Sequence, residues 1–161
     1  KVGDPVSSAD SWQVGHSGNI VKVNERLDYA LIELGSNAEV TRSYDGVTIN
    51  HLGSAPVKPG KNVCKKGVAS GETCGITWSD WNVQNVNQVC AMQGDSGAPL
   101  LVGDSVIAMV NGGLWRPPFN VACHTPLQGP IHSPTVSTSI DAIIRDLNAA
   151  PGVGNGFRLA R

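Results

Sequence analysis

Short segments in which apolar and polar residues alternate make up most of this chain, and glycine, proline and asparagine separate them. Such segments, bounded by turn residues, predict β-strands. The expected strands cover residues 19–23, 29–34, 46–52, 61–65, 74–79, 98–102 and 106–110. Because turns recur at these short intervals, the pattern predicts an antiparallel barrel or sandwich.

One segment near the end of the chain has helical spacing instead. Its apolar residues at i, i+3, i+4 and i+7 are Ile140, Ile143, Ile144 and Leu147. We expect Thr138 and Asp141 to cap the start of this helix. Pro151 and Gly152 are expected to end it. The glycine-rich tail 150–161 is expected to be a loosely ordered extension.

The length and charge of the chain narrow the classes of partner. Its 161 residues suit one domain, or two small lobes that share a core. With 12 basic and 13 acidic residues, a net charge of -1 and no charge run, neither nucleic acid nor a membrane is an expected partner. No apolar stretch approaches the roughly 18 residues of a transmembrane helix. Lys1 opens without a signal peptide, so we expect a mature or processed chain.

The four cysteines lack the paired C-x-x-C spacing of a zinc site, and neither a metal nor another cofactor is expected. An even number favours two disulfides, for which the sequence allows three pairings. The favoured pairing joins Cys64 to Cys74 and Cys90 to Cys123, with stabilisation of about 3 and about 4 kcal/mol. Disulfides persist in an oxidising compartment, so we expect a secreted or extracytoplasmic protein.

A serine stands between two glycines in the segment Gly94-Asp95-Ser96-Gly97, just before an apolar run. A serine hydroxyl becomes a nucleophile when a base takes its proton and nearby donors hold the oxyanion that forms. Glycine at 94 lets the backbone bend so that the N–H groups of Gly94 and Ser96 point into one pocket. The segment predicts a nucleophile loop.

A lone carboxylate, Asp28, opens the apolar segment 29–34. An isolated aspartate there would ordinarily just start a strand. Together with the Ser96 motif, it is predicted to orient a catalytic histidine and stabilise the imidazolium that forms.

Several motifs now resemble one family in order and spacing. They are 28–32, the cysteine segments 63–67 and 73–75, the serine loop 90–97, and 111–113 followed by Cys123. The chain is similar to chymotrypsin-fold serine proteases, and to their secreted bacterial branch with alpha-lytic and Streptomyces-type enzymes. The resemblance implies an all-β fold with two antiparallel six-stranded-type β-barrels, the first incomplete, and a C-terminal helix. The implied units are 1–60 with the triad aspartate, 61–137 with the nucleophile, the helix 138–149 and the tail 150–161.

The resemblance also implies roles for individual residues. Ser96 would be the nucleophile, Asp28 the orienting carboxylate, and the N–H groups of Gly94 and Ser96 the oxyanion hole. A substrate would pair with a backbone segment made of Asn111, Gly112 and Gly113. Lys65 would hold Asp95 beside the nucleophile.

Three positions depart from the usual residues of the family. Lys65 stands where arginine is usual, which gives a point charge in place of a bidentate fork. Asn111 replaces a serine near the triad aspartate, and Ala98 replaces a glycine. None of these substitutions forbids catalysis.

The family order is histidine, aspartate, serine, and only His16 precedes Asp28. His16 lies in a turn-like segment that does not match the histidine motif of the family, so a surface position is expected. The later histidines are expected to be structural or solvent-exposed; they are His51, His124 and His132.

Residues 1–5 resemble the stretch that closely follows the histidine motif. We therefore expect the base, with the first strands of the N-terminal barrel, to precede Lys1. A barrel without those strands would expose apolar surface and unpaired edges. The prediction is a companion polypeptide, the N-terminal part of the same precursor.

The leading hypothesis is a secreted serine endopeptidase that cleaves peptide or protein substrates through an acyl-enzyme on Ser96. The alternative is an inactive protease homologue that serves as a binding or scaffolding module. An esterase is less favoured, because Asp95 departs from the Gly-x-Ser-x-Gly elbow and strand–helix alternation is lacking.

Substrate preference is predicted from two uncharged residues, Gln88 and Val89, which are expected to line the primary pocket. They favour an apolar or small residue at the cleavage site over Arg, Lys or Glu. The bulky segment 114–119 would either wall one side of the cleft or form a surface loop packed on itself.

Overall fold

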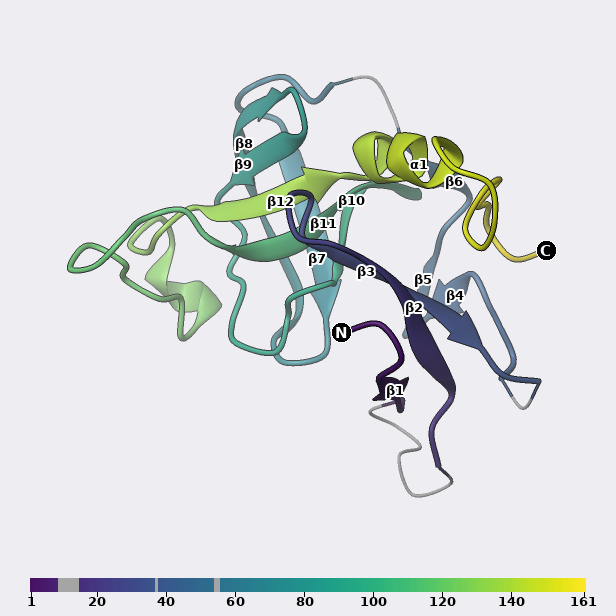
Figure 1. Ribbon diagram of the computed structural model, residues 1–161. Coiled ribbons are helices and arrows are strands. Elements are labelled where there is room, and N and C mark those ends of the chain that lie inside the picture. Colours follow the sequence, from purple (N-terminus) through teal and green to yellow (C-terminus); the bar gives the residue numbers. More distant parts are fainter. Residues whose placement is uncertain (9–14, 37, 54–55) are drawn as a thin grey trace.

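The computed structural model describes residues 1–8, 15–36, 38–53 and 56–161. Six antiparallel strands from residue 62 onward close into one barrel (Figure 1). They are β7 (Asn62–Gly67), β8 (Gly71–Trp81), β9 (Gln84–Asn87), β10 (Pro99–Val102), β11 (Ser105–Gly113) and β12 (Thr135–Ser139). Their order is β10-β7-β8-β9-β12-β11, and pairing of β10 with β11 closes the ring. The short strand β6 (His51–Leu52) adds to β11 in parallel.

The N-terminal part of the chain forms smaller sheets. β1 (Pro5–Val6), β2 (Gly18–Asn24) and β3 (Tyr29–Leu34) make a three-stranded sheet in that order. Within the described segments, β3 pairs on one side alone, with β2. β4 (Ser43–Tyr44) and β5 (Val47–Thr48) form a two-stranded ribbon. The fold prediction is thus confirmed for one closed barrel, while the other sheets are open; the single expected strand 46–52 is divided into β5 and β6.

One helix, α1 (Ile140–Asn148), follows β12 directly and covers one end of the barrel (Figure 1). Its apolar face is buried at the expected positions Ile140, Ile143 and Leu147. The N-cap is Ser139, whose side chain accepts a hydrogen bond from the Ala142 amide at 3.4 Å. The prediction of Thr138 as the cap was wrong, because β12 continues through that residue. No helix in the described part of the chain is long and apolar enough to cross a membrane.

Two strands, β9 and β12, were missed by the sequence pattern because their residues are mostly polar. Asn85, Asn87, Thr135 and Ser137 are all buried. The Asn87 side chain donates to the Asn85 side chain at 2.9 Å, and Thr135 donates to the Val89 carbonyl at 2.9 Å. These internal hydrogen bonds make burial of the polar side chains tolerable, although Ser137 Oγ and Asn85 Nδ2 have no partner among the described residues. Because polar side chains are buried here, the alternation of apolar and polar residues is lost.

Both predicted disulfides are present. Cys64 bonds Cys74 across the paired strands β7 and β8, and Cys90 bonds Cys123 over 33 residues. The second bridge ties the segment before the serine loop to the long connection between β11 and β12.

The N-terminal sheet meets the barrel through α1. A shared apolar cluster contains Leu27 and Tyr29 from the sheet, Leu101 from the barrel, and Ile143 and Leu147 from the helix. We call this contact between the N-terminal sheet and α1 the seam. Its polar contacts centre on Asp146 of α1, which accepts hydrogen bonds from Tyr29 Oη and Asn24 Nδ2 and forms an ion pair with Lys22. Those hydrogen bonds, that of Tyr29 first, lower the pKa of Asp146 to about 2.

The C-terminal tail is not the loose extension that its composition suggested. The Asn155 side chain donates to the carbonyls of Asn148 and Ala150, and the Gly156 amide donates to the Asn148 side chain at 2.7 Å. A Cβ on Gly154 would overlap Leu31 and Leu147, so the tail packs tightly against the helix and the N-terminal sheet.

Candidate active site

The serine loop is a tight turn between the Cys90 disulfide and β10. Gly94 and Gly97 have φ of 101° and 86°, conformations that side chains with a Cβ rarely adopt. The Asp95 amide donates to the Met92 carbonyl at 3.0 Å, and the Gly97 amide donates to the Val110 carbonyl on β11 at 2.7 Å. The two glycines thus place Ser96 at the tip of the turn, exposed to solvent.

Asp95 holds the serine loop in place from the protein interior. Its buried carboxylate accepts hydrogen bonds from the amides of Ala69, Ser70 and Met92, at 2.9, 3.2 and 2.9 Å, and from the Ser70 hydroxyl. Burial alone would raise the pKa of Asp95, but the hydrogen bonds from Ser70 and Met92 and the charge of Lys65 hold it below its usual range. An ionised carboxylate with this many donors fixes the position of the next residue, Ser96.

Lys65 reaches Asp95 from β7, which is the contact that the family resemblance implied. The two side chains are both fully buried, and Nζ lies 3.6 Å from the carboxylate. Nζ also donates to the Gly71 carbonyl at 2.8 Å. Burial lowers the pKa of Lys65, although the charge of Asp95 opposes this effect. Gly67 leaves room for the pair, because a Cβ there would overlap the Asp95 carboxylate.

The predicted oxyanion donors have no acceptor among the described residues. Neither the Gly94 amide nor the Ser96 amide takes part in a hydrogen bond there, and both flank an exposed turn. Free amides at a nucleophile are what an oxyanion needs. The Ser96 hydroxyl donates to the Asn111 carbonyl at 3.0 Å, so its proton points to the backbone of β11.

The end of β11 offers an open strand edge beside Ser96. Asn111, Gly112 and Gly113 follow the last residue that pairs with the serine-loop side, Val110, and the two glycines are exposed. On its other side this segment pairs with β12, through Gly112 to Val136 and Gly113 to Thr135. An extended peptide can add to such an edge by main-chain hydrogen bonds.

Asp28 lies in the turn between β2 and β3, exposed and with a φ of 55°. It lines a cavity of about 460 Å³ whose other lining residues include Asn111, Gly112 and Gly113. The turn is tied to the barrel because Thr138 Oγ1 donates to the Leu27 carbonyl at 2.7 Å.

Asn111 connects the two candidate catalytic residues. Its backbone accepts from Ser96, and its side chain donates through Nδ2 to Thr138 Oγ1 at 2.7 Å. Since the Thr138 hydroxyl donates to Leu27, the residue before Asp28, a continuous chain of contacts joins Ser96 to the Asp28 turn. The Oδ1 atom of Asn111 is buried and has no donor among the described residues.

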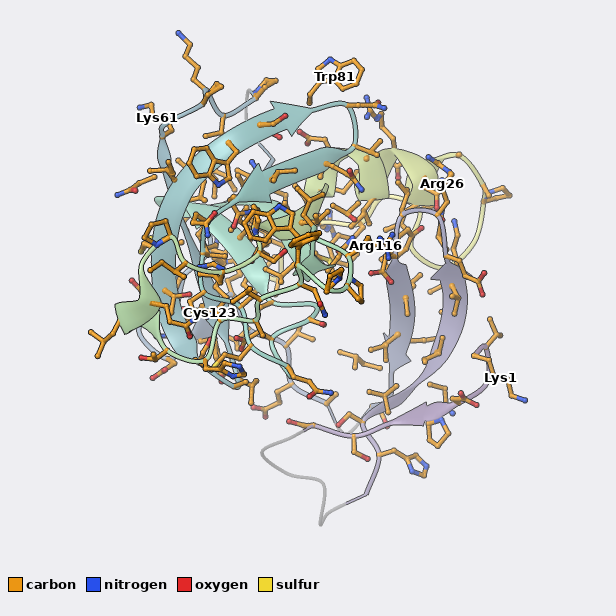
Figure 2. All side chains as sticks on the ribbon, turned by 90° about the vertical axis from the view of Figure 1, so that its left-hand side faces the viewer. Lys1, Arg26, Lys61, Trp81, Arg116 and Cys123 are labelled. Carbon is orange, nitrogen blue, oxygen red and sulfur yellow. A yellow bond between two sulfur atoms is a disulfide. The ribbon has the colours of Figure 1, made fainter. Side chains whose placement is uncertain are left out.

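A second cavity, of about 430 Å³, surrounds Ser96. Its walls include Ala91 and Met92 from the serine loop, and Trp115 and Arg116 from the bulky segment 114–119. Segment 114–119 therefore borders the cleft, and Figure 2 looks onto the face that carries it.

The predicted pocket residues Gln88 and Val89 do not line this cavity. Val89 is fully buried in the barrel core. Gln88 lines a separate cavity of about 440 Å³, accepts from Trp78 Nε1 at 2.7 Å and donates to the His132 carbonyl at 3.0 Å. Their role in substrate binding stays a prediction.

None of the four histidines lines either cavity at Ser96 or Asp28. His16 lies at the far end of β2, beside Glu33 and Gly35. His51 is on β6, His124 is exposed, and His132 is buried with Nδ1 2.8 Å from the Ser133 carbonyl. The arrangement therefore has a serine, donors and a carboxylate, but these histidines supply no base to it.

One cluster in the described residues has metal-ligand types, Cys64, Glu72 and Cys74. Its two cysteines form a disulfide and offer no thiolate. The cluster therefore does not suit a metal.

Thr138 and Arg116 are the site residues that sequence reasoning did not single out. Thr138 was assigned to a helix cap, since a threonine before an apolar helical segment is the usual signal of a cap. Arg116 was noted only as part of a bulky segment. Neither signal shows that β12 and the segment after β11 border the same cleft.

No protein-family model matches the sequence, and no curated protein matches it significantly. Several solved structures are similar to it in fold. Protease A from Thermobifida fusca is 23% identical with a TM-score of 0.68, over 92% of this chain and 77% of that one. The chymotrypsin of Cellulomonas bogoriensis is 22% identical with a TM-score of 0.62, over 80% and 72% of the two chains. The Nocardiopsis protease is 22% identical with a TM-score of 0.59, over 80% and 70%.

These likenesses show that the chain has the chymotrypsin-like serine protease fold, as its motifs predicted. At such low identity, the likeness concerns the fold.

Proposed function

We propose that this chain is the nucleophile-bearing part of a serine endopeptidase. Ser96 attacks the peptide carbonyl, the amides of Gly94 and Ser96 hold the oxyanion, and Asp28 orients a histidine. The observation that carries the proposal is the Ser96 turn itself, clamped by a buried ion pair and flanked by free amides and an open strand edge.

The base is proposed to come from a segment outside these 161 residues, which the order of triad residues places before Lys1. Support comes from the N-terminal sheet, which we take as the remainder of a first barrel in residues 1–60. Val23, Ile32 and Leu34 are 42%, 38% and 47% exposed, and one edge of β3 pairs with no strand in the described segments. Strands of a companion polypeptide would cover both. About a quarter of the length of each of these two solved structures has no counterpart in this chain.

An oxidising compartment fits the same proposal. The two disulfides, with no free cysteine among the described residues, favour a secreted protein. Peptide or protein substrates follow from the proposed reaction.

The second candidate is an inactive homologue that binds a partner through the same cleft. It is favoured by one observation, that no histidine of the chain lines the cavity at Ser96. The cleft would then hold a peptide without cleaving it.

Labelling with a fluorophosphonate distinguishes the two candidates. In the complete assembly we expect modification of Ser96, its loss in Ser96→Ala, and a rate about 10³- to 10⁴-fold lower in Asp28→Asn. Ser79→Ala, an exposed serine on β8, is the matched control and should label as the native protein does. A complete assembly that does not label would leave the binding module as the function.

Intact mass and N-terminal sequencing of protein from its native source test the companion. The expected result is a second, tightly held polypeptide that carries a histidine. A single well-folded species that begins at Lys1 and lacks any partner would contradict this part of the proposal.

A further inference from the structure

We infer that Arg116 selects substrates with an acidic side chain on the amino-terminal side of the cleaved bond. The inference rests on the proposed function, because it names the substrate class of the same cleft. The observation behind it is charge: among the described residues that line the cavity at Ser96, Arg116 is the one with a charge.

Arg116 borders both halves of the site. It lines the cavity at Ser96 and also the cavity at Asp28, which meet at the backbone of Asn111, Gly112 and Gly113. A peptide that adds to this edge therefore passes the guanidinium. In Figure 2, Arg116 lies on the side of the molecule turned toward the viewer.

The backbone around Arg116 is held in place. The Leu114 amide donates to the Pro134 carbonyl at 2.8 Å, and the Trp115 amide donates to Ser133 Oγ at 2.8 Å. On the other side, the Phe119 amide donates to the Arg116 carbonyl at 2.9 Å and closes a turn. Anchored on both sides, the side chain is presented to the cleft by a defined backbone.

The guanidinium has no carboxylate partner in the described part of the chain. No ion pair or side-chain hydrogen bond of Arg116 is formed there, although Asp28 lines one of its two cavities. Its five N–H donors match a carboxylate in a bidentate geometry. Because the proposed histidine engages Asp28, the carboxylate that Arg116 takes is that of the substrate.

The direction of the strand fixes where that carboxylate lies. β11 runs away from Ser96 as it passes from Asn111 to Gly113. A peptide added antiparallel runs toward Ser96, so residues before the cleaved bond lie along this segment and reach Arg116. The acidic side chain therefore lies on the amino-terminal side of the cleaved bond.

Peptide binding tests this without requiring hydrolysis. The Ser96→Ala chain is titrated with acetylated, amidated alanine-based hexapeptides that differ in one glutamate or glutamine, with binding followed by the amide NMR signals of Gly112 and Gly113. The glutamate peptide should bind about threefold to tenfold tighter, and less so as salt is raised. Arg116→Gln should abolish the difference, and Arg116→Glu should favour a lysine peptide. Arg145→Gln, an exposed arginine on α1, is the control and should keep the preference.

Equal affinity for the two peptides, no binding of either to the folded chain, or a preference that survives Arg116→Gln would each overturn the inference. If Arg116→Gln weakens both peptides equally, Arg116 does not select the carboxylate, and the inference also fails. The fluorophosphonate experiment tests the proposed function separately. Labelling of Ser96 without a glutamate preference contradicts only the inference about Arg116. A glutamate preference without labelling contradicts only the protease.

Discussion

The barrel and the N-terminal sheet differ in how completely they bury their apolar residues. In the barrel, Leu100 and Val63 are at most 1% exposed, and a closed ring of strands leaves no free edge between neighbours. In the N-terminal sheet, Ile32 and Leu34 are 38% and 47% exposed, and β3 has one edge without a partner strand among the described residues. The barrel carries its share of the proposed site in full, namely the serine turn, the amides of Gly94 and Ser96, and the open strand edge at residues 111–113. The proposed base, which would lie against the N-terminal sheet, is not among the described residues.

The barrel half of the site depends most on the buried pair beneath Ser96. We predict that Lys65→Ala lowers the free energy of unfolding by about 3–5 kcal/mol, because it leaves the Asp95 carboxylate buried without its cation. Urea denaturation measures the loss. Lys61→Ala, an exposed lysine just before β7, should change stability by less than about 1 kcal/mol. Similar values for the two variants would show that the pair does not hold the loop.

Core substitutions in the two regions test the comparison directly. Leu100→Ala should cost about 2–5 kcal/mol, because its side chain is fully buried in the barrel core. Ile32→Ala should cost less than about 1 kcal/mol in the chain alone, since that side chain keeps a large exposed fraction. In the complete assembly the cost of Ile32→Ala should rise, as would follow if a companion covers β3. If Ile32→Ala lowers the free energy of unfolding equally with and without the companion, the companion does not pack against β3.

The smallest effect is expected at the seam, and it depends on pH. Asp146 has a pKa of about 2 in the folded chain, below the roughly 3.9 of an unfolded aspartate. Its contribution to stability is therefore full above about pH 4 and is lost as the pH falls toward about 2. Thermal unfolding at a series of pH values should show Asp146→Asn less stable than the native chain at neutral pH, with the gap closing across that range.

Tyr29→Phe refines the same prediction, because the Tyr29 hydroxyl is the main cause of the lowered pKa of Asp146. This variant should lose the Asp146 contribution at a higher pH than the native chain. A gap between the native chain and Asp146→Asn that is constant from pH 7 to about pH 2 would contradict both expectations.

Strands and helix could be predicted where the apolar pattern matched the fold. The expected strand 29–34 is β3 residue for residue, and the helix buries its predicted face. β9 was missed because Asn85 and Asn87 are buried as hydrogen-bonded polar residues, which no alternation reveals. The candidate site was predictable to the same extent. A local motif indicated Ser96, but Thr138 was assigned to a helix cap, because its hydrogen-bond partner Leu27 is 111 residues away in the sequence.

The sequence alone determined the features that a single segment encodes: the serine between two glycines, the helix, and the lack of a histidine in the motif of the family. It favoured the correct cysteine pairing among three, and the structure decided it. Only the tertiary structure decided which of the many polar residues meet. Barrel closure brings β11 and β12 beside the Asp28 turn, and with them Asn111, Thr138 and Arg116. The reason is physical, because side-chain proximity across a closed sheet depends on strand order and register, which no single segment encodes.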